Sequence, residues 1–173
     1  DGIQHYYQPV QIDAGTRVLL GPQALLVFHA PLRIEGTARQ PVVITALDPL
    51  QPFAALVLNG PGANGSHLQH CAFSQGSAYK DALHNFTAML SVHEVADVVI
   101  ERCRFTANSA ADDLVHAVYS SLHIVHSEFL YSTGDGLDQE PRQRPLQSLL
   151  AEPQKTDGGR REKFPDGRHP VPA

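Results

Sequence analysis

The chain has 173 residues and a mass of 18.8 kDa, with 42% hydrophobic and 18% charged residues. This composition suits one packed domain with or without a tail, and it excludes wholesale disorder. The sequence holds no apolar run long enough for a membrane-spanning helix, and its net charge of −5 argues against a general nucleic-acid binder. Two cysteines exclude a disulfide scaffold, while 13 Gly, 13 Pro and no Trp favour many turns between strands.

Charge divides the chain into two parts. Residues 1–140 contain 6 Lys or Arg and 14 Asp or Glu, a net of −8, whereas residues 141–173 contain 7 and 4, a net of +3. The second part also holds 6 of the 13 prolines and few apolar residues. We therefore predict a folded domain over 1–140 and a basic, Pro-rich tail over 141–173, mostly disordered or extended.

The beginning of the chain carries no secretory signal. It starts at Asp1, without a Met, a basic segment or an apolar segment. We expect a processed or excised chain, for which export stays open.

Short apolar runs separated by Gly or Pro fill the first third of the sequence. Each run has three to five residues and is rich in β-branched side chains, which is typical of strands. No helical pattern of 10–15 residues intervenes, so alternating strands and helices are not expected. The predicted strands lie at 9–12, 18–20, 25–28, 32–34 and 42–44.

A sequence pattern recurs in the second half of the domain, with the order apolar, any residue, basic, Cys or Ser, any residue, Phe. Its phenylalanines, Phe73, Phe105 and Phe129, are 32 and 24 residues apart, and an insertion at 79–86 accounts for the longer interval. A period near 24 with three short strands fits one coil of a β-helix. The inward columns would be Leu68/Ile100/Ile124, Cys71/Cys103/Ser127 and Phe73/Phe105/Phe129. A β-sandwich is the alternative, but it does not need like residues at a constant period.

Several segments carry a family resemblance. The stretch 10–48, with Ile12-Asp13-Ala14-Gly15-Thr16 and Leu32-Arg33-Ile34-Glu35-Gly36-Thr37, is similar to the opening coils of right-handed parallel β-helix proteins. The stretch 98–138 resembles later coils of the pectin-lyase-like β-helix segments in bacterial surface proteins, some of which accompany CotH-type kinase domains. The resemblance implies an all-β, right-handed parallel β-helix of about five coils and a secreted, periplasmic or cell-surface location. It implies no single activity, because the superfamily includes lyases, hydrolases, epimerases and non-catalytic modules.

The repeat stops at residues 138–140 without the cap that closes a complete β-helix. An uncapped end exposes core and edge strands, so we expect a fragment or truncated product that self-associates through this end of the solenoid.

Recurring carboxylates form the first candidate site. Asp112, Asp113, Asp135 and Asp138 fall at turns of neighbouring coils, where Asp112 would lie about one strand spacing from Asp135. Asp112, Asp135 and Asp138 could hold Ca²⁺, and Asp112, Asp113 and Asp135 could serve acid–base or nucleophilic catalysis. The plainer interpretation is that these residues bond to backbone N–H groups in turns.

A basic column forms the second candidate site. His70, Arg102 and His126 each precede the Cys or Ser of the repeat and should face outwards at a bend. Such a strip could bind an acidic sugar, and an Arg beside a base could stabilise an enolate, which makes Arg102 and His126 catalytic candidates. A solvated position is the plainer interpretation. His116 and His123 are interpreted as surface residues. Cys71 and Cys103 would be neighbours, packed as free thiols or bridged.

Two functions compete at this point. One is a non-catalytic module that contacts carbohydrate or a surface protein. The other is a polysaccharide lyase, epimerase or glycoside hydrolase acting on acidic polysaccharide, which would need the carboxylates and the basic column to face one groove.

Overall fold

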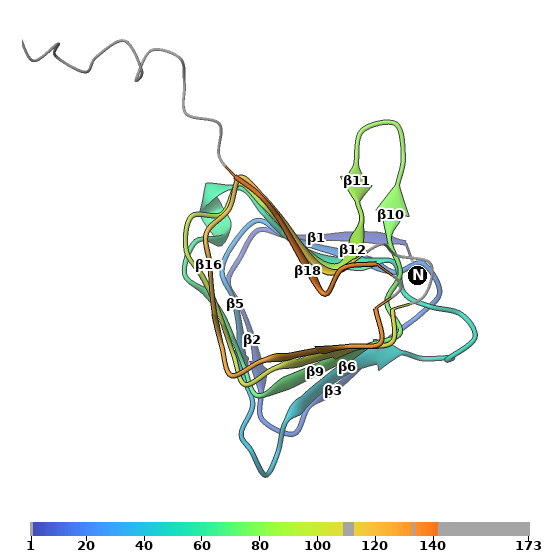
Figure 1. Cartoon of the computed structure of the whole chain (residues 1–173), viewed down its shortest axis with the longest axis vertical. Coiled ribbons are helices and arrows are strands. Elements are labelled where there is room, and N and C mark those ends of the chain that lie inside the picture. The colour runs from blue at the N-terminus through green and yellow to red at the C-terminus, as the bar shows by residue number, and fades with distance from the viewer. Residues whose placement is uncertain (1, 109–112, 133, 142–173) are drawn as a thin grey trace, which may run out of the picture. The chain divides into compact units, whose positions relative to one another are not determined.

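The structure, a computed structural model, describes residues 2–108, 113–132 and 134–141. They form an all-β parallel solenoid of about five coils, so the predicted parallel β-helix is confirmed. Figure 1 looks down the solenoid, with the chain passing from β1 to β2 to β3 around a three-sided cross-section. The predicted tail lies outside the described residues, apart from Pro141.

Three parallel sheets make the three sides of the solenoid. Sheet A runs in the order β1 (Ile3–Tyr6), β4 (Leu25–Phe28), β7 (Ala55–Asn59), β12 (Ala88–His93), β15 (Asp113–Val118), β18 (Leu137–Glu140). Sheet B contains β2 (Val10–Asp13), β5 (Leu32–Glu35), β8 (Ser66–Gln69), β13 (Val98–Glu101) and β16 (Leu122–Val125). Sheet C contains β3 (Arg17–Leu20), β6 (Val42–Ala46), β9 (Cys71–Ser74), β14 (Arg104–Thr106) and β17 (Glu128–Leu130). One antiparallel hairpin, β10 (Tyr79–Lys80) with β11 (Asn85–Phe86), and one 3₁₀ turn, η1 (Pro61–Ala63), complete the described elements.

In sheets B and C, more buried and more exposed side chains alternate along each strand. In β5, Leu32 and Ile34 are fully buried while Arg33 and Glu35 face solvent. Because successive side chains point to opposite faces, each strand places one apolar set inside the solenoid.

Three of the bends between sheet B and sheet C, those after β8, β13 and β16, each use one non-glycine residue with positive φ. His70, Arg102 and His126 have φ of 46°, 51° and 50°. This left-handed conformation costs a residue with a Cβ about 1–2 kcal/mol. The backbone N–H groups of His70 and Arg102 offset part of that cost by donating hydrogen bonds to carbonyls of the next coil, at 3.0 and 2.9 Å.

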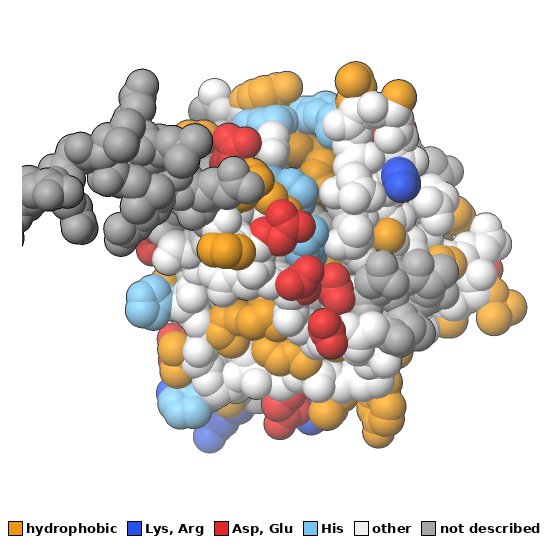
Figure 2. Space-filling model, turned by 45° about the horizontal axis from the view of Figure 1, so that its top comes forward, with side chains coloured by type: hydrophobic (Ala, Val, Ile, Leu, Met, Phe, Trp, Pro, Cys, Tyr) orange, Lys and Arg blue, Asp and Glu red, His pale blue; other side chains and the backbone are white. Residues whose placement is uncertain are grey.

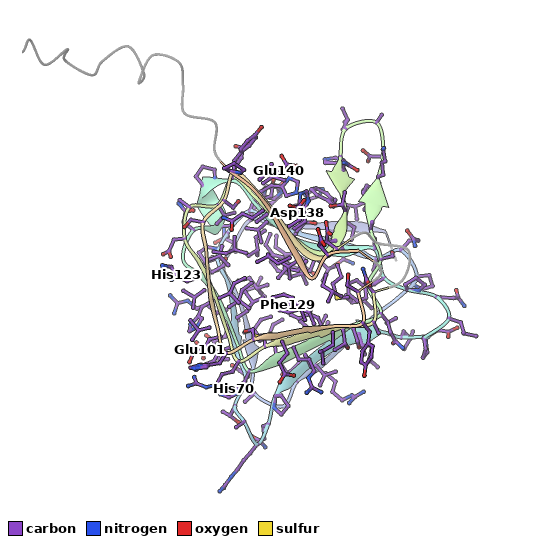
Figure 3. All side chains as sticks on the ribbon, in the orientation of Figure 1. His70, Glu101, His123, Phe129, Asp138 and Glu140 are labelled. Carbon is purple, nitrogen blue, oxygen red and sulfur yellow. The ribbon has the colours of Figure 1, made fainter. Side chains whose placement is uncertain are left out.

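The core is a set of columns that run from coil to coil. Phe105 stacks on Phe73 and on Phe129, with ring centroids 5.0 and 5.3 Å apart. Ile100 pairs in register with Leu68 and Ile124 in the same way. The predicted columns Leu68/Ile100/Ile124 and Phe73/Phe105/Phe129 are therefore confirmed, and Cys71 and Cys103 of the third predicted column are buried. Figure 3 shows Phe129 inside the ribbon outline.

The insertion predicted at 79–86 is the hairpin β10–β11, which stands out from the solenoid in Figure 1. Its Phe86 and Tyr79 pack on the outer face of sheet A, against a second apolar cluster. That cluster contains Leu25, Val27, Ala54, Ala55 and Val57. Part of sheet A is thus covered on both faces.

The stacked phenylalanine column should dominate the stability of the fold. We predict that Phe105→Ala lowers the free energy of unfolding by about 3–5 kcal/mol, because it leaves a cavity between two rings. Leu83→Ala is the control, since Leu83 is 87% exposed at the hairpin tip and should change stability by less than about 0.5 kcal/mol. Urea denaturation measures the free energy of unfolding of both variants. Equal losses of stability would contradict the dominant role of the phenylalanine column.

Candidate functional site

The outer face of sheet A beside the hairpin gathers polar side chains from three neighbouring strands. The register places Ser91 of β12, His116 of β15 and Asp138 of β18 side by side. The next outward row contains His93, Val118 and Glu140. Figure 2 shows acidic and histidine side chains gathered on this face of the molecule. We call His93, His116, Asp138 and Glu140 the sheet A cluster.

His116 lies at the centre of the sheet A cluster. Its side chain is buried, and its Nδ1 is 2.8 Å from the hydroxyl oxygen of Thr87, which follows the hairpin. Its Nε2 lies 3.7 Å from a carboxylate oxygen of Asp138 and 3.6 Å from one of Glu140. The interpretation of His116 as a surface residue is wrong, because the hairpin and the final described coil enclose it.

His93 is held by rings on both sides. Phe86 lies edge-on to it at 5.1 Å and His116 at 5.9 Å. Burial, and secondly the charge of His116, lower the pKa of His93 to about 4, so the ring is neutral near pH 7. Its Nε2 is buried with no hydrogen-bond partner.

Of the predicted carboxylates, the structure places Asp113 beside Asp135, because Val115 pairs with Leu137. The carboxylate of Asp113 accepts a hydrogen bond from the backbone N–H of Asp135 at 3.2 Å, the turn-stabilising role of the plainer interpretation. Asp112 lies outside the described residues.

Metal binding by the carboxylates stays a prediction. Within residues 2–108, 113–132 and 134–141, no group of three or more His, Cys, Asp or Glu is arranged to hold a metal ion. Asp138 of the proposed Ca²⁺ set faces His116 instead of joining Asp135 in a ligand group.

The predicted basic column lies at another corner. His70, Arg102 and His126 follow strands of sheet B, whereas Asp113 begins a strand of sheet A, beyond sheet C. Figure 3 shows His70 and Glu101 at the corner remote from Asp138 and Glu140. The structure does not bring the two predicted sets into one groove. Arg102 also forms an ion pair with Glu101, which reduces the positive charge of the strip.

Cys71 and Cys103 are buried free thiols on neighbouring coils. Burial raises the pKa of the Cys71 thiol, and the Cys103 Sγ donates to the Leu68 carbonyl oxygen at 3.3 Å. Both residues pack as small core side chains, and the protonated, buried Cys71 thiol is a poor nucleophile.

Comparison with known proteins assigns neither a family nor a function to this site. No protein-family model, curated protein or solved structure matches the chain. The described residues contain no helix of the length and apolarity needed to cross a membrane.

The low pKa of His93 makes stability depend on pH. Between about pH 6.5 and pH 4 the unfolded chain binds a proton that the folded chain does not, so stability falls as pH falls. Because one proton is involved, the slope cannot exceed about 1.4 kcal/mol per pH unit, and partial screening of the half-buried ring by water reduces it further.

Thermal unfolding across this pH range checks the prediction. The His93→Gln variant should show a shallower decline, whereas the control His123→Gln, exposed on sheet B, should keep the slope of the unmodified chain. Identical slopes in all three proteins would contradict the account of His93.

Proposed function

We propose that the chain is a non-catalytic β-helix module that contacts carbohydrate through the outer face of sheet A. The sheet A cluster carries this proposal, because it sets two imidazole rings beside two carboxylates on neighbouring strands. Sugar rings present apolar C–H faces and hydroxyl groups together. A protein surface that combines flat rings with hydrogen-bonding groups can contact both parts of the sugar. A surface protein is the second class of partner for the same face.

Charge favours a neutral carbohydrate over an acidic one. Residues 1–140 have a net charge of −8, and Asp138 and Glu140 stand on the proposed contact face. An acidic polysaccharide would be repelled by both the local and the summed charge.

Fewer residues support the enzymatic alternative than support the binding proposal. A lyase, epimerase or hydrolase would depend on His116 with Asp138 and Glu140, since the predicted catalytic sets lie at separate corners. The backbone hydrogen bond to Asp113 and the ion pair of Arg102 further favour the non-catalytic proposal. A role in contacting external polysaccharide would place the protein outside the cytoplasm, in the periplasm, at the cell surface or secreted.

Glycan binding tests the proposal directly. On an array of neutral and acidic oligosaccharides, the protein should bind to neutral ones. The double variant Asp138→Asn/Glu140→Gln should bind them at least about tenfold more weakly. Glu128→Gln, an exposed carboxylate on sheet C, is the matched control and should bind normally. Retention of acidic glycans alone, or equal binding by all variants, would reject the proposed face.

An absorbance assay separates binding from catalysis. Acidic polysaccharides incubated with the chain, with and without EDTA, should yield no unsaturated products. Product formation lost in Asp138→Asn would establish the enzymatic alternative instead.

We also propose that the chain associates with copies of itself through the end of the solenoid. The inward side chains of the final described coil are half-buried, among them Leu122, Ile124 and Phe129. We predict that light scattering after size exclusion finds a mass that rises with concentration, and that Phe129→Ser reduces the rise. A concentration-independent monomer would contradict this prediction.

A further inference from the structure

Histidines gather on one side of the solenoid. The chain contains 10 histidines, and five lie on the outer face of sheet A or on the hairpin beside it: His5, His29, His84, His93 and His116. Figure 2 shows histidine side chains on this face, both in the acidic region and at its edge. Neutral imidazole is the commonest protein ligand of transition metals.

One pair among these histidines already has two ring nitrogens in close approach. His5 belongs to β1 and His29 directly follows β4, the neighbouring strand of the sheet. The Nδ1 of His5 lies 3.0 Å from the Nε2 of His29. The rings stack with centroids 5.3 Å apart and planes inclined by 19°.

The surroundings hold this pair in position. Tyr7 stacks on His29 with centroids 4.7 Å apart and planes inclined by 8°. The backbone N–H of His29 donates to the carbonyl oxygen of Tyr6 at 2.8 Å, which fixes the two chain segments side by side. His5 is exposed and His29 half-buried, so an ion in water can reach the nitrogens.

Two nitrogens bound to one tetrahedral Zn²⁺ at about 2.0–2.1 Å lie about 3.3–3.4 Å apart, so the two rings need to separate only slightly to share an ion. We propose that His5 and His29 form a two-histidine site for a divalent transition ion of the imidazole-binding class, with water completing the coordination. Binding replaces the hydrogen bond between the rings, so each ring carries its proton on the nitrogen away from the ion. No third His, Cys, Asp or Glu joins the pair within the described ranges, so the site is open and exchangeable.

The electrostatics of the pair suit this role. Burial first, and the nearby His5 second, lower the pKa of His29. The neutral ring, which is the form that binds metal, is therefore retained to lower pH. The site is independent of the proposed carbohydrate contact, which uses other residues.

Titration of the full chain with Zn²⁺ by calorimetry is the test. We expect one ion per chain, with affinity at least about tenfold lower in His5→Gln and in His29→Gln. His123→Gln, an exposed histidine on sheet B, should bind like the unmodified chain. Affinity should also fall as pH falls, because protons compete with the ion for the ring nitrogens.

Three results would overturn the proposal: no binding at millimolar Zn²⁺, unchanged binding in both variants, or a loss in only one of them. A loss confined to His5→Gln would mean that His5 binds with a group other than His29. Thermal unfolding of each variant without metal confirms that it remains folded, so that a loss of binding reports the missing ligand.

Discussion

The in-register stacking of one coil on the next is the constraint on which this molecule depends. Because all three sheets are parallel, a side chain that points inwards in one coil meets its counterpart in the coils above and below. Phe73, Phe105 and Phe129 satisfy this requirement with stacked rings. The left-handed residues at the bend between sheets B and C satisfy it with backbone hydrogen bonds to the next coil. The repeat in the sequence is therefore the direct consequence of the geometry.

Sheet A departs from this regularity, and its departure creates the candidate site. The hairpin β10–β11 covers part of the outer face and buries apolar side chains there. The adjoining outward positions on β12, β15 and β18 are polar, and the same hairpin encloses them from one side. Thr87, directly after the hairpin, contacts His116. One insertion thus accounts both for the second apolar cluster and for the buried histidine beside two carboxylates.

The sequence predicted sheets B and C well because only one of their faces is buried. In β5 and β14 the apolar positions alternate with polar ones, and the Cys and Phe columns recur at a readable period. The later strands of sheet A lack this signal: β12 and β15 are buried almost throughout, so alternation disappears and His116 looks isolated. The sequence signal for the sheet A cluster was a polar residue inside an otherwise apolar strand, such as His116 in β15.

Nuclear Overhauser contacts between the phenylalanine rings test the central claim, the in-register parallel stacking, most directly. With the three phenylalanines selectively labelled, we predict contacts from Phe105 to Phe73 and to Phe129, at ring centroid distances of 5.0 and 5.3 Å, and none between Phe73 and Phe129. Close Hα–Hα contacts between strands of sheets B or C, which are typical of antiparallel pairing, would contradict the solenoid.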